Sequence, residues 1–460
     1  MDYLHALLVL ASSGVLTSGM QRELHLNLFI NGKGHHEAAW RHPQASSLRM
    51  TDFAYYHSLA ARAEAAAIDA IFLADTLVLN SDVGGSVRGG LEPVTALAAL
   101  AASTTQIGLI ATASTTYTEP YNLARQFATL DHISRGRVGW NIVTTYSPEA
   151  GHNFGQDRTI AHAERYERAE EFMSVVTALW DSWADDAIIE NRNTGQYADE
   201  SRIRPASFKG NFYQVAGALN VPRSPQGHPV LVQAGSSDDG RAFASRHAEA
   251  VFTAHLEKAT AQDFYRDLKS RAVENGRSAN EILILPGFSP VIAGTETEAR
   301  RILDELDDLA NPEIGRARIS VRFGGHDFSH LPLDRPLTVD DFPDPSTVQA
   351  ARSRTEIILE RVRRESPTLR QLLRTMAGAR GHFTAAGTPE QIADHIETWY
   401  REGAADGFNI MPSILPSMLD AFVDEVIPIL RKRGLFRSRY AGNTLREHYG
   451  LSRPTNHYFA

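Results

Sequence analysis

The chain has 460 residues, no cysteine and a formal net charge of -9. The lack of cysteine excludes disulfides, thiolate metal sites and a cysteine nucleophile, and it suits a reducing, cytoplasmic location. Charged residues are spread along the chain without a long basic run, which argues against a nucleic-acid-binding protein. No stretch of the sequence approaches the roughly 18 uninterrupted apolar residues of a membrane span.

The first residues contain an apolar run, 4–16, that resembles the core of a signal peptide. The segment before this run carries Asp2 and no Lys or Arg, so the positive charge of a signal peptide is missing. Met20 stands just before the first convincing strand. We therefore expect residues 1–21 to be an extension outside the fold, either disordered or the product of a start assigned too early.

Short apolar runs alternate with helical patterns from residue 22 to residue 435. The expected strands, in chain order, are 24–31, 70–75, 107–115, 137–145, 230–233, 250–254, 282–293 and 407–412. The expected helices are 51–67, 92–102, 120–133, 161–183, one that begins at 241, 259–275, 295–309, 351–376, one that begins at 388, and 416–432.

Continuous apolar strands that alternate with helices predict a parallel sheet covered by helices. Eight such units that close on themselves form a (β/α)8 TIM barrel, which we expect as a single α/β domain over 22–435. A doubly wound open sheet is the alternative, but no GxGxxG follows the first strand. Residues 185–227 and 311–386 are too long for simple connections, so we expect insertions at the C-terminal mouth of the barrel. The tail, 436–460, is expected to pack on the barrel or on a partner subunit.

The chemistry of a barrel is carried by residues where the strands end. These positions are Asn31, Asp75, Ser114, Thr115, Asn141, Thr144, Gly235, Ser236, Ser289 and Met411. They are rich in hydroxyls and amides, and no metal cluster, serine nucleophile elbow or glycosidase carboxylate pair stands out. His35 and His36 are adjacent in a loop, so we interpret them as a surface pair. A protein so poor in nucleophiles and acids is typical of one whose cofactor carries the reaction.

The turn after the fifth strand has features of a phosphate site. Gly235, Ser236 and Ser237 precede a helix, and free backbone N–H groups at a helix N-terminus suit an anion. An ordinary capped turn explains this stretch equally well when it is taken alone. Asp238 and Asp239 complement the helix dipole, but they would repel a phosphate unless both point away.

Two further residue pairs favour the phosphate interpretation. Thr112 and Ser114 share one face of the third strand, and His162 and Tyr166 lie four residues apart on one helix face. Polar filling of the barrel and decoration of a helix surface are the alternatives. Taken with the strand-five turn, the pairs are consistent with one ring of residues around an aromatic, phosphorylated ligand.

Several segments resemble the nitrilotriacetate / dibenzothiophene-sulfone monooxygenase family. They are YTEPYNLARQFATLDHISRGRVGWNIVT (117–144), AHAERYERAEEF (161–172), the stretch 208–254 and TLREHYGL (444–451). Members of this family are the large components of two-component flavin monooxygenases with the bacterial-luciferase barrel. The resemblance covers roughly residues 22–451, and the N-terminal extension departs from the family pattern.

The resemblance implies an FMN-dependent monooxygenase that oxygenates a small organic substrate through a flavin C4a-(hydro)peroxide. It implies reduced FMN (FMNH2) from a separate NAD(P)H:FMN reductase, molecular oxygen as co-substrate, and a homodimer or homotetramer. It places Asp75, Thr112, Ser114 and Asn141 near the flavin ring, His162 and Tyr166 toward the flavin and its phosphate side, and Gly235, Ser236 and Ser237 at the phosphate. His162 is also the single weak candidate for a catalytic acid or base.

Two other functions remain open from the sequence: a deazaflavin-dependent dehydrogenase on the same barrel, and a non-catalytic flavin-binding protein. The substrate is open as well. Five arginines near the second insertion either attract an anionic substrate or form a solvated helix face. They are Arg352, Arg354, Arg361, Arg363 and Arg364.

Overall fold

The computed structural model describes residues 22–79, 81–85, 87, 89–145, 147–157, 160–344, 352–379 and 381–459. The N-terminal extension expected over residues 1–21 lies outside the described residues. Eight parallel strands close into a barrel in the order β10-β9-β4-β3-β2-β1-β13-β11, and pairing between β10 and β11 completes the ring. The prediction of a closed (β/α)8 barrel is therefore confirmed, and the open-sheet alternative is excluded.

The barrel strands are short, and nearly every residue in them is buried. They are β1 (His25–Ile30), β2 (Ala70–Leu73), β3 (Gly108–Ser114), β4 (Val138–Val143), β9 (Val230–Gln233), β10 (Ala250–Thr253), β11 (Leu283–Ile292) and β13 (Gly407–Ile410). Alternate residues face opposite sides of the wall. In β1, Leu26 and Leu28 pack with the outer helices, whereas Phe29 belongs to the cluster inside the barrel.

Helices cover the outside of this wall. They are α2 (Phe53–Ala65), α3 (Pro93–Ser103), α4 (Pro120–Ser134), α6 (His162–Trp180), α7 (Asp238–His247), α8 (Lys258–Glu274), α13 (Pro389–Arg401), and the final α14 (Ser417–Ala421) and α15 (Ile427–Lys432). A π-helical turn, Phe422–Val426, joins the last two, so the final helix expected over 416–432 is one irregular helix. Pro428 lies just beyond this turn and has no N–H to continue a regular α-helix.

Strand β11 is longer than the barrel needs, and its second half pairs with a strand that the sequence did not reveal. Along one edge, β11 pairs first with β10 and then, from Phe288 to Ile292, with β12 (Phe383–Gly387). Phe288 also pairs with Ile410 of β13 on the other edge. Strand β12 therefore extends the barrel wall at the mouth, beyond the point where β10 ends.

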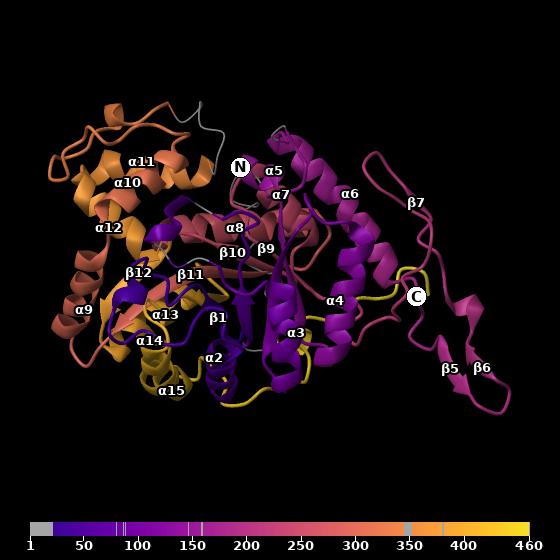
Figure 1. Ribbon diagram of the computed structural model, residues 1–460. Helices are drawn as coiled ribbons and strands as arrows, with labels where there is room; N and C mark the ends of the chain where they lie inside the picture. The colour runs from indigo at the N-terminus through magenta and orange to yellow at the C-terminus, as the bar shows by residue number, and fades with distance from the viewer. Residues whose placement is uncertain are drawn as a thin grey trace, which may run out of the picture.

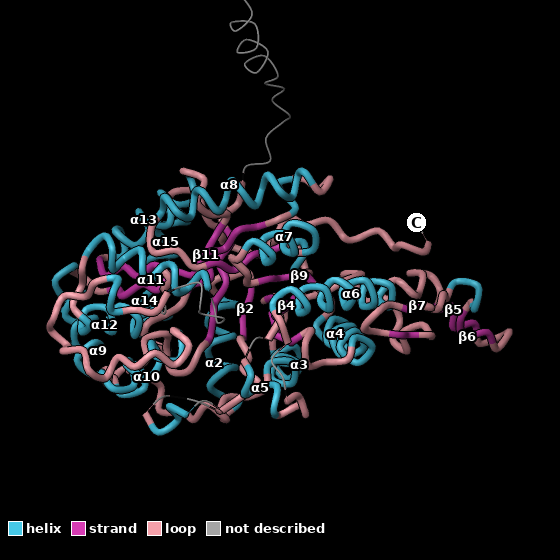
Figure 2. The backbone as a smooth tube through the Cα atoms, turned by 90° about the horizontal axis from the view of Figure 1, so that it is seen from above, coloured by secondary structure: helices cyan, strands magenta, loops and turns pink. Residues whose placement is uncertain are grey.

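The first insertion, 185–227, begins at the end of the barrel opposite the mouth, contrary to expectation. Helix α6 has already run back from the mouth, so Asp181 at its end meets His228 just before β9, with Nε2 and Oδ1 2.8 Å apart. The hairpin of β5 (Ile188–Asn191) and β6 (Gln196–Ala198) projects from the body in both views (Figures 1 and 2). A second hairpin, of β7 (Phe208–Lys209) and β8 (Gln214–Val215), follows the outside of α6.

The second insertion does lie at the mouth. It follows the C-terminal end of β11 and holds α9 (Glu296–Leu309), α10 (Pro312–Arg322), α11 (Arg352–Glu365) and α12 (Leu369–Ala379), which gather to one side of the barrel (Figure 1). It contacts the loop after β1: His36 Nε2 lies 3.1 Å from Asp307 Oδ1, and Arg318 forms an ion pair with Glu37. This insertion therefore forms one wall of the entrance.

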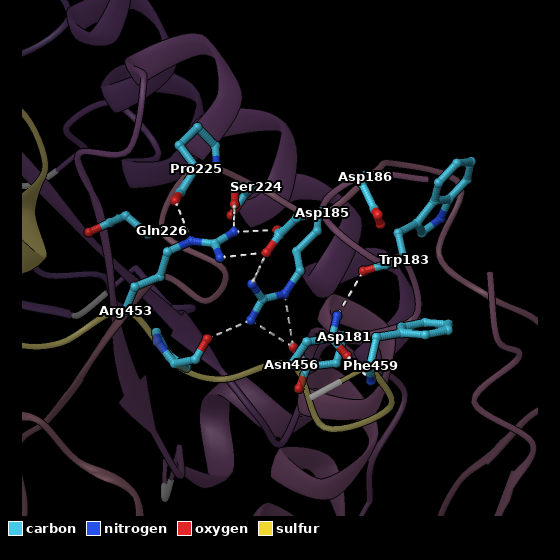
Figure 3. Close-up of polar contacts among 12 residues, drawn as sticks. Asp181, Trp183, Asp185, Asp186, Ser224, Pro225, Gln226, Arg453, Asn456 and Phe459 are labelled. Atoms are coloured by element: carbon cyan, nitrogen blue, oxygen red, sulfur yellow. Dashed lines mark hydrogen bonds and ion pairs between the residues drawn. The ribbon is translucent and has the colours of Figure 1, made fainter. Parts of the chain in front are cut away.

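The chain after α15 closes the other end of the barrel. A short helix, α16 (Leu445–His448), brings Leu445, Tyr449 and Leu451 into the cluster inside the strands. The Tyr449 hydroxyl donates to Asn27 Oδ1 at 2.7 Å. Further along, Arg453 binds Asp185 of the first insertion with N–O distances of 2.7 and 2.5 Å, and Asn456 donates to the Trp183 carbonyl (Figure 3). The tail thus fastens the first insertion to the barrel at the end opposite the mouth.

Candidate functional site

The polar residues at the ends of β3 and β4 form one side of the mouth. Thr112 and Asn141 are neighbours in the β3–β4 pairing, and Asn141 Nδ2 donates to Thr112 Oγ1 at 2.8 Å. Both side chains are buried, with Asn141 4% exposed, yet Asn141 Oδ1 has no hydrogen-bond partner among the described residues. A buried amide oxygen without a donor is costly, so this atom is suited to accept an N–H from a ligand.

Ser114 lies further out on the same face of β3, as the period of two requires. Its hydroxyl oxygen accepts from Thr145 Oγ1 at 2.7 Å and from the Thr116 backbone N–H at 3.1 Å. These contacts fix the turn that leaves β3 against the one that leaves β4. Ser114 therefore holds the shape of the rim, and Thr112 lies deeper in the barrel.

Three elements meet at the hydroxyl of Tyr166. This residue projects from α6, and its hydroxyl is within hydrogen-bonding reach of Ser237, before α7, and of Thr144, after β4. Burial raises the pKa of the Tyr166 hydroxyl, an effect that the Ser237 and Thr144 contacts partly offset. Tyr166 therefore stays protonated at neutral pH and can donate a hydrogen bond to an anion.

Ser237 is the N-cap of α7, and its hydroxyl accepts from the Gly240 N–H at 3.1 Å. A Cβ at Gly235 would lie 2.3 Å from Nε2 at the end of the flexible Gln233 side chain and 3.1 Å from the Gly240 Cα. Glycine at this position therefore lets the turn pass closely over the start of the helix.

Each of the two aspartates behind this turn is paired with a residue of another helix. Asp238 Oδ1 lies 2.7 Å from Arg271 Nη2, and Asp239 Oδ2 lies 3.0 Å from His162 Nε2. His162 is exposed and also receives a contact at 3.2 Å from Arg165 Nη2 to Nδ1. The His162 and Tyr166 rings have centroids 5.0 Å apart, so the predicted pair does share one side of α6 next to the α7 terminus.

Asp75 lies at the end of β2, apart from the residues around Tyr166. Its Oδ1 accepts from the Thr76 N–H at 2.8 Å. Burial and, more weakly, the nearby charge of Glu92 raise the pKa of this carboxyl, against the effect of the Thr76 hydrogen bond. Asp75 is thus a carboxyl at the mouth that holds its proton to a higher pH than usual.

Sequence patterns did not reveal the aromatic residues inside the mouth. Phe29, Phe72 and Phe252 come from three strands and pack edge to face, with ring centroids 4.7 to 5.6 Å apart. His382, just before β12, stacks on Phe252 at 5.0 Å with an angle of 7° between the rings. These rings give the mouth an apolar floor suited to a flat aromatic ligand.

The interpretation of His35 and His36 as a surface pair is wrong, because the loop after β1 folds back under the second insertion. Both residues are 1% exposed. His35 packs on Phe29 at 4.6 Å between centroids, and its Nε2 lies 2.8 Å from the Phe29 carbonyl oxygen. His36 pairs with Asp307 of α9. The adjacent rings do diverge, as expected, but each points into a different packed region.

The basic residues of α11 whose side chains are described are already paired. Arg361 binds Glu365 at 2.9 Å, Arg363 lies 3.6 Å from Glu360, and Arg364 forms an ion pair with Glu257 of the barrel. The side chains of Arg352 and Arg354 lie outside the described residues. The paired arginines support a solvated helix face more than a site for an anion.

A different cationic group lines a pocket between the loop after β1 and α10. The lining includes Lys33, Arg318, Glu37 and Trp40. Lys33 Nζ is buried, lies 4.4 Å from the centre of the Tyr55 ring, and has no hydrogen-bond partner among the described residues. Burial lowers the pKa of Lys33, and the charge of Asp52 opposes that shift only in part. This ammonium is the kind of group that an anionic substrate would stabilise.

Within the described ranges, no group of three or more His, Asp or Glu side chains is placed to hold a metal ion. In the same part of the chain, no helix is both long and apolar enough to cross a membrane.

Comparison with known proteins gives a consistent result. Residues 33–407 match the family described as luciferase-like monooxygenase. The chain is 46% identical to N-acetyl-S-(2-succino)cysteine monooxygenase of Bacillus subtilis, over 95% of this chain and 99% of that protein. It is 43% identical to nitrilotriacetate monooxygenase component A of Aminobacter aminovorans, over 95% and 98%. A crystal structure of riboflavin lyase with modified FMN and riboflavin superposes with a TM-score of 0.82 at 34% identity, covering 94% of this chain and 97% of that one.

The resemblance seen in the sequence is thus confirmed over nearly the whole described chain, and it favours oxygenation over the dehydrogenase and carrier alternatives. The chain belongs to the luciferase-like monooxygenase family.

Proposed function

We propose that the protein oxygenates a small organic substrate with reduced FMN and molecular oxygen, and that a separate NAD(P)H-dependent flavin reductase supplies the reduced FMN. The observation that carries this proposal is the meeting of Tyr166, Ser237 and Thr144 at the N-terminus of α7, beside an aromatic floor. A cytoplasmic location, where reduced nicotinamide is available to the reductase, is part of the proposal.

The residues present fit FMN. Free N–H groups at the start of α7, with the hydroxyls of Ser236, Ser237 and Tyr166, would hold the phosphate. The Phe29, Phe72 and Phe252 rings would support the isoalloxazine, and the unsatisfied Asn141 Oδ1 would accept one of its N–H groups. Thr112 would keep the Asn141 amide in place through the existing hydrogen bond.

When bound, reduced FMN supplies the two electrons that activate oxygen. The protein binds and orients the flavin, positions the substrate and excludes water from the mouth. The second insertion and the loop after β1, joined by the His36–Asp307 and Arg318–Glu37 contacts, would provide the excluding wall. Asp75, whose pKa is raised by burial, would be the carboxyl at the mouth able to hold a proton.

We further propose that the substrate carries carboxylates. Two relatives at 46% and 43% identity are named for nitrilotriacetate and N-acetyl-S-(2-succino)cysteine, both of which carry several carboxylates around a C–N or C–S bond. Lys33, with no hydrogen-bonded partner among the described residues, lines the pocket beside Arg318 and would balance one such charge. Cleavage of a C–N or C–S bond would follow oxygenation.

The proposal is tested by oxygen uptake with a flavin reductase, FMN and NADH over a substrate panel. The panel contains nitrilotriacetate, N-acetyl-S-(2-succino)cysteine and a neutral thioether of similar size, and products are identified by mass. We expect substrate-dependent product only with the carboxylates. If no member of a wide panel gives an oxygenated product with reduced FMN, the oxygenase assignment is wrong. If only the neutral thioether reacts, the carboxylate assignment is wrong.

The phosphate site has its own test. The double variant Ser237→Ala with Tyr166→Phe should weaken binding of FMN by about ten-fold or more, because it removes two donors to an anion worth roughly 1 kcal/mol or more each. Riboflavin, which has no phosphate, should bind the variant and the wild type alike. Unchanged FMN affinity would show that the phosphate lies elsewhere.

Light scattering in solution will test the homodimer or homotetramer that we propose.

A further inference from the structure

The proposed phosphate site contains a carboxylate in an unexpected place. The Oδ2 atom of Asp239, in the first turn of α7, lies 3.0 Å from His162 Nε2. Asp239 also acts electrostatically on Tyr166, whose pKa it helps to raise. One negative side chain is thus close to both residues of α6 that the flavin is proposed to meet.

The neighbouring carboxylate behaves differently. Asp238 occupies the same helical turn, but it is bound to Arg271 on α8, which also binds Asp267 at 3.0 Å. Asp238 is therefore neutralised by a cation that has no part in the proposed site. The two aspartates carry the same charge in the same helical turn but contact different partners, which makes them a natural pair for comparison.

We propose that Asp239 competes with the flavin phosphate for His162 and so keeps the affinity for FMN low. This inference rests on the proposed function, because it takes the α7 terminus as the phosphate site. A phosphate that binds there must draw His162 away from Asp239 or share it, and it meets the repulsion of a nearby carboxylate. The side chains of His162 and Asp239 are 46% and 56% exposed, so the pair can open without unpacking the core.

The consequence suits a protein that receives its flavin from another enzyme. Flavin must enter reduced and leave oxidised in each cycle, and a tightly held phosphate would slow the exchange. Asp239 pairs with His162 when the phosphate departs, and so speeds the release of FMN. The remaining hydrogen-bond donors still allow FMN to bind specifically.

The alternative role for Asp239 is to orient His162, in the way that carboxylates fix histidine ligands. The two roles predict opposite effects. If Asp239 competes, its removal tightens FMN binding. If Asp239 orients His162 toward the phosphate, its removal weakens FMN binding.

The test compares Asp239→Asn with Asp238→Asn, which removes the same charge from the same helical turn. FMN and riboflavin are titrated separately, oxidised in air and reduced under anaerobic conditions, and the rate of FMN release is followed by fluorescence. We expect Asp239→Asn to bind FMN about five-fold more tightly and to release it more slowly, with riboflavin unchanged. Asp238→Asn should change FMN affinity by less than about two-fold, and the Asp239→Asn effect should shrink as salt rises.

Weaker or unchanged FMN binding by Asp239→Asn overturns the inference, as does an equal gain in Asp238→Asn, which would indicate a general charge effect. Ser237→Ala separates this failure from that of the proposed function. If Ser237→Ala weakens FMN relative to riboflavin while Asp239→Asn has no effect, the phosphate site stands and the competition does not. If neither variant changes the ratio of FMN to riboflavin affinity, the phosphate site itself is misplaced.

Discussion

Tyr449→Phe offers a stringent test of the barrel interior. The Tyr449 ring is 2% exposed, and its hydroxyl donates to Asn27 Oδ1 at 2.7 Å. Asn27 in turn donates to Asn409 Oδ1 at 3.0 Å, and Asn409 donates to the Leu285 carbonyl at 2.9 Å. The substitution keeps the ring and its packing but leaves Asn27 Oδ1 buried without this donor.

A buried acceptor that loses its donor costs about 1–3 kcal/mol, and we expect the free energy of unfolding to fall by that amount. With an unfolding entropy of about 2.1 cal/mol/K per residue, a protein of 460 residues should melt about 1–3 °C lower. Urea unfolding and calorimetry at one fixed scan rate measure the two quantities, because large proteins often unfold irreversibly.

Tyr197→Phe is the matched control, since Tyr197 is 63% exposed on the projecting hairpin. It should leave both the urea midpoint and the melting temperature unchanged. If Tyr449→Phe is as stable as this control, the hydrogen bond that links Tyr449 of the tail to Asn27 of β1 contributes nothing to stability, and the reasoning fails.

Two further predictions concern pH. Burial alone would raise the pKa of Asp181, but contacts with His228, the His457 N–H and Arg223 outweigh burial and hold that pKa below its usual range. Ionised Asp181 therefore stabilises the folded protein above the unfolded pKa of about 3.9, and this stabilisation is lost as pH falls through the lower folded pKa. Asp181→Asn should therefore destabilise the protein by about 3–5 kcal/mol at pH 7 and by less at a pH below the lowered folded pKa of Asp181, and urea midpoints that differ equally at both pH values would contradict this. The pKa of Asp75 is shifted in the opposite direction, because burial raises it in the folded protein. Protonated Asp75 therefore stabilises the folded protein below about pH 3.9, and this stabilisation is lost as pH rises through the folded pKa. Asp75→Asn should lose less melting temperature than the wild type between pH 4 and pH 7, and parallel losses would show that this carboxyl is not the cause.

The barrel could be predicted from the sequence because each strand is a continuous apolar run between helical patterns, and all eight runs became strands. Helix starts were equally clear where capping residues marked them. Glu92 accepts from the Val94 and Thr95 N–H groups at 2.9 and 2.7 Å, and Thr388 with Gln391 forms a capping box. These capping signals are local, so they can be read from the sequence without knowing which segments pack together in the fold.

The missed features depend on contacts between distant segments. The sequence of β12, FTAAG, has few residues that favour strands, and it forms because the free edge of β11 beyond β10 offers hydrogen bonds. His35 and His36 are buried only because the second insertion covers their loop. The sequence showed the length of the first insertion but not the end of the barrel at which it begins, so the insertion was wrongly expected at the mouth.

The same limit applies to the candidate site. The position of Tyr166 next to Ser237 follows from spacing and from the family resemblance, since both lie where a barrel brings helix starts to the mouth. The directions of Asp238 and Asp239 depend on Arg271 and His162, from other helices, and no local pattern specifies them. The aromatic floor could not be predicted from the sequence either, because phenylalanine in a buried strand is an ordinary core residue.

The pairing of β1 with β13 has a consequence for how the protein is made. Asn27 and Asn409, which face each other in this pairing, are 382 positions apart in the chain. At roughly 5–20 residues per second, β1 would wait on the order of 20–80 s during synthesis before its partner exists. During this interval the edges of β1 and of the growing sheet are open templates for pairing with other chains. Yield in the cell should therefore depend on how well these edges are shielded until the ring closes, and slower translation should favour aggregation.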